Sequence, residues 1–223
     1  MDQNDDREDL TSVAKHSKST AKSTVPAAAV RTRRAYFDCR FGQLHVRTAF
    51  PTTGGFDEQV PLFCLHSEQS SSRAFARFLP EIADVRSVYA PDMPGLGESD
   101  PPPAAGVNAV AGAISDLADD LRLRQIDLLG LHGGARVSLD LAAARPALVR
   151  RLVLVGVPAV EGLPVVEQQT LIMRTRLETP EDLAKLKSAL PNGKFVDIDD
   201  YASDLFAAAP ITLAKQIGTF LTG

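Results

Sequence analysis

The sequence has few cysteines, no long apolar run and no excess of basic charge. Cys39 and Cys64 are its only cysteines among 223 residues, and two thiols cannot form a structural zinc site alone, so we expect buried free thiols. The longest apolar runs, such as Leu152–Val160, are far shorter than the roughly 18 to 20 residues that span a bilayer. With 24 basic and 28 acidic residues the formal net charge is -4. These features argue against nucleic-acid and membrane partners.

The first residues also lack the apolar segment of a secretory signal, which leads us to expect a cytoplasmic protein. Residues 1–33 are rich in Asp, Lys, Ser, Thr and Ala and offer little apolar surface to offset the entropy of ordering. We therefore predict a disordered N-terminal tail over 1–33 and one folded domain over 34–223.

Short apolar runs dominate the rest of the chain. Two alternating stretches, Ala35–Arg40 and Leu44–Ala49, predict a pair of strands joined by a turn at Gly42. Further strands are predicted at Pro61–Leu65, Ser87–Ala90, Ile126–Leu129, Leu152–Val157, Thr170–Met173 and Phe195–Ile198. Helices are predicted between them, at Ser71–Ala83, Ala109–Leu121, Gly134–Ala144, Pro180–Leu190 and Pro210–Leu221. This alternation predicts an α/β fold, a doubly wound and mostly parallel sheet flanked by helices.

The segment Gly130-Leu131-His132-Gly133-Gly134 lies between a predicted strand and a predicted helix. That is the context of the nucleophile elbow G-x-S-x-G, in which small residues allow a strained turn and a close approach of helix to strand. The central residue here is His132 instead of serine.

Two more segments extend the similarity, Leu65-His66-Ser67-Glu68 and the loop Ala90–Asp100 with its Pro-Gly-Leu-Gly core. From about Arg34 to Leu221 the chain resembles the α/β-hydrolase fold superfamily. The resemblance implies a nucleophile at position 132, an acid after the seventh strand, a histidine after the last strand, and an oxyanion hole of backbone N–H groups.

Each position that the resemblance assigns to a Ser-Asp-His triad carries another residue. His132 stands at the elbow, Thr175, Arg176 and Leu177 stand where the acid belongs with only Glu178 nearby, and Ser203 stands at the histidine position. Because a triad acts as a unit, these replacements argue against ordinary serine-hydrolase chemistry.

The resemblance also assigns roles to the residues around the elbow. The backbone N–H groups of Glu68 and Gly133 would form the oxyanion hole, but Ser67 replaces the glycine of relatives and the Glu68 carboxylate would oppose a developing oxyanion. His66 is expected to brace its loop.

The connection between the sixth and seventh strands is short, since Pro158 to Gln169 is only 12 residues. That length is close to the minimum of about a dozen for a parallel crossover. The predicted fold is therefore shortened between strands 6 and 7, with no room for the helical cap of relatives, and its cleft is expected to be open to water.

The replaced triad and the short connection leave three hypotheses. The first is a catalytically degenerate protein that binds a small ligand or a partner. The second is an unconventional hydrolase or lyase that uses His132 on a small ester or carbonyl substrate, with Glu178, Glu161 or Asp204 as partner. The third is a shortened paralogue of low stability. We expect no cofactor and no metal, since the acidic run of Asp197, Asp199, Asp200 and Asp204 has no calcium-loop pattern.

Overall fold

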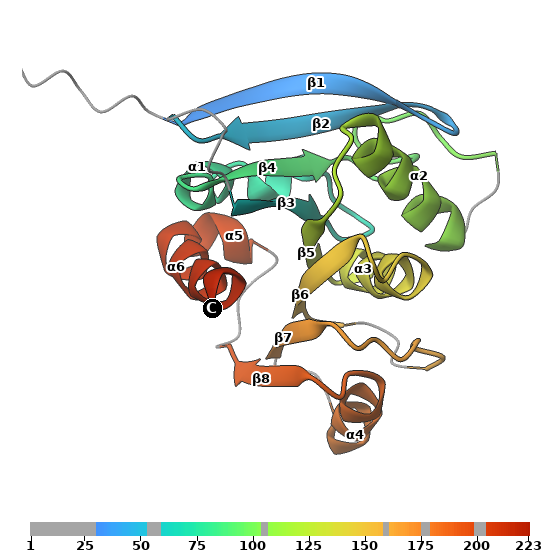
Figure 1. The fold of residues 1–223 in the computed structure, drawn as a ribbon, viewed down its shortest axis with the longest axis vertical. Helices are drawn as coiled ribbons and strands as arrows, with labels where there is room; N and C mark the ends of the chain where they lie inside the picture. The colour runs from blue at the N-terminus through green and yellow to red at the C-terminus, as the bar shows by residue number, and fades with distance from the viewer. Residues whose placement is uncertain (1–29, 53–58, 104–106, 158–160, 175–178, 199–203) are drawn as a thin grey trace, which may run out of the picture.

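The computed structural model describes residues 30–52, 59–103, 107–157, 161–174, 179–198 and 204–223. Within them, eight strands form one sheet in the order β1-β2-β4-β3-β5-β6-β7-β8 (Figure 1). The strands are β1 Arg31–Cys39, β2 Gly42–Phe50, β3 Gln59–Leu65, β4 Arg86–Pro91, β5 Ile126–Leu131, β6 Val149–Val155, β7 Gln169–Arg174 and β8 Gly193–Asp197. β2 runs antiparallel to both of its neighbours, and the other pairs are parallel. The predicted mostly parallel sheet is confirmed.

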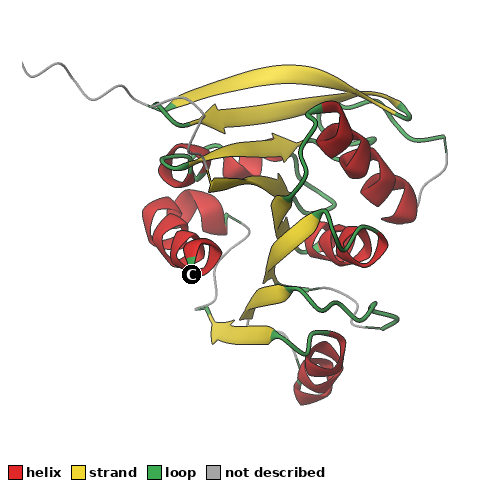
Figure 2. Ribbon diagram, in the orientation of Figure 1, coloured by secondary structure: helices red, strands yellow, loops and turns green. Residues whose placement is uncertain are grey.

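Helices cover both faces of the sheet (Figure 2). They are η1 Ser72–Phe75, α1 Leu79–Ile82, α2 Val107–Asp120, α3 Gly133–Ala144, α4 Pro180–Ala189, α5 Leu205–Ala208 and α6 Pro210–Thr222. α2, α3 and α4 lie on one face, and α1, α5 and α6 on the other. The sheet therefore separates two hydrophobic cores. On β5, Leu128 packs into the core on the side of α2, α3 and α4, and its neighbour Leu129 packs into the core on the side of α1, α5 and α6. Burial on both faces explains why the central parallel strands are mostly apolar.

The N-terminal strand begins earlier than the predicted domain boundary. β1 starts at Arg31, and its pairing with β2 runs from Arg31 opposite Phe50 to Cys39 opposite Gly42. Residues 31–33, predicted to belong to the tail, are therefore in the sheet. Backbone pairing does not require apolar side chains, and exposed charges such as Arg33 and Arg34 are typical of an edge strand.

The single helix predicted over Ser71–Ala83 is wrong. The chain forms the 3-10 helix η1 and then the short helix α1. Pro80 explains the break, because it has no N–H to donate to the carbonyl four residues earlier and is tolerated only in the first turn of a helix.

The two cysteines are free thiols. Cys64 on β3 is fully buried, and burial raises the pKa of its thiol. Cys39 at the end of β1 is half-buried.

A buried cluster of charges joins the amino ends of the central strands to the last helix. Asp127 accepts hydrogen bonds from Arg86 Nη1 at 3.0 Å and from Arg150 Nε and Nη2 at 2.9 and 2.6 Å. The side chains of Arg86 and Asp127 are both 0% exposed. Arg150 Nη2 also donates to the Leu221 carbonyl at 2.8 Å. The cluster therefore connects β4, β5 and β6 to the end of α6.

Candidate active site at the elbow

The turn between β5 and α3, where the sequence predicts a nucleophile elbow, has a strained backbone. His132 has φ 50° and ψ -114°, a conformation that costs a non-glycine residue about 1–3 kcal/mol. The His132 N–H donates to the Val155 carbonyl of the neighbouring strand at 2.9 Å. The fold thus holds position 132 at the carboxyl edge of the sheet, where α/β proteins bind ligands.

Glycines on both sides make this turn possible. A Cβ on Gly130 would lie 2.4 Å from the Ala135 Cα, and a Cβ on Gly134 would lie 2.1 Å from the Leu65 carbonyl oxygen. Both contacts are with backbone atoms, which cannot turn away as a side chain can. The glycines therefore permit α3 to pass close to β3 and β5.

The imidazole of His132 has a defined orientation. Its Nδ1 lies 3.1 Å from the Gly156 carbonyl oxygen, and because a carbonyl only accepts, Nδ1 carries the proton. The side chain is exposed. In the neutral ring Nε2 then keeps its lone pair and can act as a base or nucleophile.

Among the described residues, the hydrogen-bond partner of the His132 ring is the Gly156 carbonyl, and not Glu161 or Asp204. Glu161 pairs with Lys185, at 3.6 Å from the ammonium, and the Arg136 guanidinium on α3 binds the backbone carbonyls of Glu161 and Gly162. Asp204 is exposed at the start of α5. Glu178 and Ser203 lie outside the described residues.

Glu68 lies against the first turn of α3. A Cβ placed on Gly133 would be 2.5 Å from Glu68 Oε1, so the carboxylate occupies the space beside the Gly133 backbone. Ser67 is half-buried in the same loop. A negative charge at the amino end of a helix is favourable, but at this place it also disfavours an oxyanion on the substrate.

His66 connects the loops that follow β3 and β4. Its Nδ1 donates to the Ser67 carbonyl at 2.7 Å, and its Nε2 accepts from the Met93 N–H at 2.9 Å. The side chain is fully buried, and burial lowers its pKa despite the opposing hydrogen bond to Ser67. The neutral ring therefore braces the loop that presents Glu68.

Asp92 is the centre of a second bracing network beside the site. Its carboxylate accepts from the N–H groups of Ser72 at 2.6 Å and Glu98 at 2.9 Å, and it lies 2.9 Å from His45 Nδ1. Burial raises its pKa, but the hydrogen bonds from Ser72, Glu98 and His45 outweigh burial and lower it overall. The Pro-Gly-Leu-Gly loop is thus fixed by an ionised buried carboxylate.

We expect this carboxylate to make the fold sensitive to acid. Its pKa in the folded state lies below the ordinary 3.8, so its contribution to stability is complete above that pH and is lost as pH falls through the folded pKa. Asp92→Asn should lower the free energy of unfolding at pH 7 by about 1–3 kcal/mol. Below pH 3.8 the free energy of unfolding of the variant should decrease less steeply with falling pH than that of wild type. Urea denaturation between pH 2.5 and 7 measures both, and equal acid slopes for wild type and variant would contradict the assignment.

The connection from β6 to β7 has no helix in its described part, residues 161–168. The Val166 N–H donates to the Ala189 carbonyl at 2.9 Å, and Asn192 Nδ2 donates to the Glu167 carbonyl at 2.7 Å. The short connection is therefore attached to α4 and the turn that follows it.

In the described residues no three His, Cys, Asp or Glu side chains gather closely enough to hold a metal ion. Asp197, part of the acidic run, is paired with Arg174 across the carboxyl ends of β7 and β8. No helix among the described residues has the length and apolarity to cross a membrane.

The fold and the elbow define a class of protein. A family model described as alpha/beta hydrolase fold matches residues 60–179, and the chain belongs to this family. It is 39% identical over 117 residues to the 2-hydroxymuconate semialdehyde hydrolase of Pseudomonas sp. (strain CF600), a match that covers 48% of this chain and 41% of that protein. It is 35% identical over 101 residues to the 2-hydroxy-6-oxo-2,4-heptadienoate hydrolase of Pseudomonas putida, covering 43% and 37%. The chain thus spans about two fifths of the length of these relatives.

Solved structures support the same fold over a longer stretch. The epoxide hydrolase CorEH superposes with a TM-score of 0.74 at 12% identity, over 86% of this chain and 99% of that one. A predicted CIB-like hydrolase of Thermoplasma acidophilum superposes with a TM-score of 0.75 at 15% identity, over 86% and 98%. At these identities the likeness shows the fold alone.

Proposed function

We propose that this chain binds a small ester or carbonyl compound at the elbow and hydrolyses it slowly, with His132 as the reacting base or nucleophile. The observation that carries the proposal is the state of His132. Its backbone keeps the strained elbow conformation, its Nδ1 is bound to the Gly156 carbonyl, and its ring is exposed to solvent. Strain of this kind persists where the surrounding structure maintains it, and it gathers at functional sites.

The chemistry needs only groups at the elbow. Nε2 takes a proton from water, the hydroxide attacks the ester carbonyl, and the tetrahedral intermediate expels the alkoxide, which recovers the proton from Nε2. Alternatively, Nε2 attacks the ester carbonyl and expels the alkoxide, and water then hydrolyses the acyl-imidazole to the carboxylic acid and the free imidazole. The Gly133 N–H, at the amino end of α3, is a donor available to the oxyanion, while the Glu68 carboxylate opposes it. Because the Gly133 N–H stabilises the oxyanion and the Glu68 carboxylate destabilises it, we expect slow turnover.

The relatives favour a hydrolase. The two curated proteins described above are named as hydrolases of a semialdehyde and of an oxo-dienoate, which are carbonyl compounds. The chain has His132 at the position where the α/β-hydrolase resemblance assigns the nucleophile. We therefore transfer the class of reaction and not their substrates.

Hydrolysis of p-nitrophenyl acetate by purified protein tests the proposal. We expect His132→Ala to lower kcat/KM by about tenfold to a hundredfold, near the lower end of what a positioned base contributes. His132→Gln, whose amide can still donate to the Gly156 carbonyl, is the matched control and should be equally slow, because it lacks the basic nitrogen. Activity of His132→Ala equal to wild type would refute the role of His132.

A second candidate is ligand binding without turnover, and the Glu68 carboxylate beside Gly133 favours it. Glu68→Gln removes this charge and keeps the shape of the side chain. If the site is hydrolytic, the variant should turn over the ester several-fold faster than wild type. The other outcome is that neither wild type nor Glu68→Gln turns over the ester. If both then bind p-nitroacetanilide, the unreactive amide analogue, and His132→Ala does not bind it, the function is binding.

A further inference from the structure

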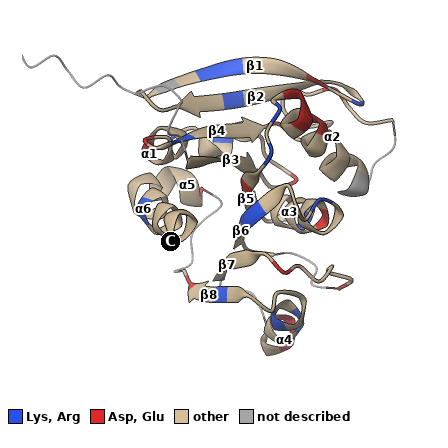
Figure 3. Ribbon diagram, viewed as in Figure 1, with Lys and Arg blue, Asp and Glu red and all other residues tan. Residues whose placement is uncertain are grey.

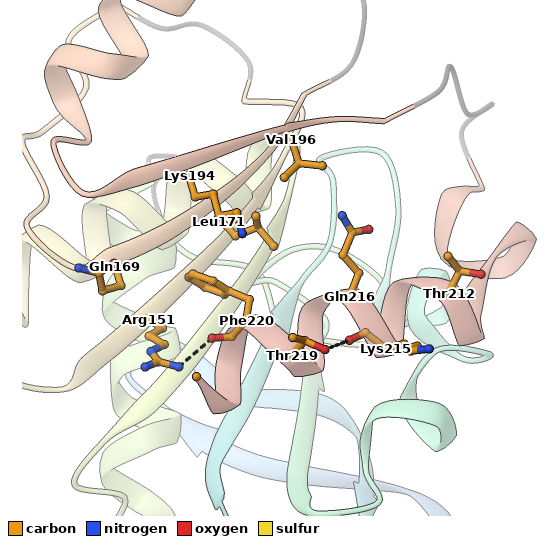
Figure 4. A pocket seen from close by; sticks show the side chains of 11 residues that line it. Arg151, Gln169, Leu171, Lys194, Val196, Thr212, Lys215, Gln216, Thr219 and Phe220 are labelled. Carbon is orange, nitrogen blue, oxygen red and sulfur yellow. Dashed lines mark hydrogen bonds between the residues drawn. The ribbon is translucent and has the colours of Figure 1, made fainter.

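A groove of about 810 Å³ lies between α6 and the last three strands of the sheet (Figure 4). Its apolar wall is made by Leu171 on β7, Val196 on β8 and Phe220 on α6. Its basic lining residues are Arg151 on β6, Lys194 on β8 and Lys215 on α6. Its volume is within the usual range of about 300–1,000 Å³ for small-molecule sites.

The groove is separate from the elbow. Arg151 is paired with Gln169 at the start of β7, and Leu171 with Lys194 at the start of β8. These residues lie toward the amino ends of the strands, whereas His132 follows the carboxyl end of β5. The sheet therefore presents two different sites, one at its carboxyl edge and one on its α6 face.

The charged side chains among the described lining residues all have one sign. None of these described side chains is acidic, and in the same part of the chain the ammonium groups of Lys194 and Lys215 have no carboxylate side chain within ion-pair distance. Both lysines are exposed. Figure 3 shows basic residues on β6, β8 and α6, three of the four elements around the groove. In a chain with a net charge of -4 this is a local basic site.

Hydrogen bonds from two arginines of β6 fix the end of α6 at one side of the groove. Arg151 Nη1 donates to the Phe220 carbonyl at 2.7 Å, and its guanidinium carbon lies 5.8 Å from the centre of the Phe220 ring. Arg150 holds the next carbonyl, that of Leu221. The helix is thereby fixed beside β6, at one side of the groove. The apolar wall and the ring of Phe220 are preorganised for a ligand.

We propose that this groove is a second binding site, for a small carboxylate with an apolar body. The body would lie on Leu171, Val196 and the Phe220 ring, and the carboxylate would meet the ammonium of Lys194 at the rim. A carboxylate complements the basic side chains of Lys194 and Lys215, and an apolar body complements the apolar wall. The site is independent of the elbow chemistry.

Binding of 2-naphthoate, followed by isothermal titration calorimetry with the full chain, tests the proposal. We expect a saturable site whose dissociation constant rises about threefold to tenfold in Lys194→Gln, the loss of one charge-assisted contact. Gln216→Trp, which places a large ring in the groove from α6, should abolish binding. The dissociation constant should also rise with salt, because the attraction is screened.

Matched controls distinguish the groove from the elbow and from a general attraction between opposite charges. Arg124→Gln removes one positive charge from an exposed position before β5 and should leave binding unchanged, and His132→Ala should do so too. The neutral analogue 2-naphthalenemethanol should bind more weakly. Loss of binding in His132→Ala, or equal binding by wild type, Lys194→Gln and Gln216→Trp, would overturn the proposal. Circular dichroism of each variant excludes misfolding as the cause.

Discussion

Replacing Asp127 by alanine is expected to lower the free energy of unfolding by about 3–5 kcal/mol. Asp127 is 0% exposed and is the carboxylate between Arg86, also 0% exposed, and Arg150. Its loss leaves the Arg86 guanidinium buried without a counter-charge, and water cannot reach it in the folded state. Urea denaturation monitored by circular dichroism measures the change.

An exposed ion pair provides the control. Asp119 pairs with Arg145 at 3.0 Å, with side-chain exposures of 55% and 41%, and Asp119→Asn should cost at most about 1 kcal/mol. Asp127→Asn, which keeps the shape and one acceptor, should be intermediate. If Asp127→Ala destabilises no more than Asp119→Asn, the buried cluster does not stabilise the fold.

Gly134→Ala is expected to destabilise the fold by about 3 kcal/mol or more, at the upper end of the cost of overpacking a core. The added Cβ would lie 2.1 Å from the Leu65 carbonyl oxygen and 2.6 Å from that of His66. Relief requires α3 to move away from β3, which would shift His132 and separate Glu68 from Gly133. The variant should therefore lose both stability and elbow activity.

Gly218→Ala in α6 is the matched change. The nearest atom to its added Cβ is the Ile82 Cδ1 at 3.5 Å, an ordinary contact. Alanine is a better helix former than glycine by about 1 kcal/mol, so this variant should be slightly more stable than wild type. Thermal unfolding of the two variants side by side should give opposite shifts. Similar melting temperatures for Gly134→Ala and wild type would contradict the close approach of α3 to β3.

The sheet and most of its helices follow from local sequence patterns. β5 and β6 are mostly apolar because both of their faces are largely buried, and α4 begins at the predicted Pro180, with Thr179 as its cap. The predicted elements were wrong where particular residues, or pairing with another strand, override the local pattern of apolar residues. Pro80 divides the predicted helix over 71–83, and arginines at the start of β1 concealed a strand that depends on pairing with β2.

The strained turn at His132 lies where the sequence predicts an elbow, whereas the contacts around it could not be predicted. The glycines around His132 identify the elbow, and the sequence also indicates that Glu68 lies near it. The Gly156 carbonyl that binds His132, and the Lys185 ammonium that pairs with Glu161, depend on how β6, α3 and α4 are placed in space. Likewise, Arg151, Lys194 and Phe220 are far apart in the sequence, so the groove they line has no local signal.

The contacts that α5 and α6 make with the rest of the fold join residues far apart in the sequence, and this affects the order of folding. The ring of Phe206 packs on Phe75 and Phe78 at 4.9 and 5.0 Å between centroids, and Arg150 reaches the Leu221 carbonyl across 71 positions of the chain. Contacts of such large sequence separation require closure of long loops and form slowly. We therefore expect the α2–α3 face to consolidate first. The opposite face, with η1 and α1, should remain open to solvent and prone to association until the last helix docks.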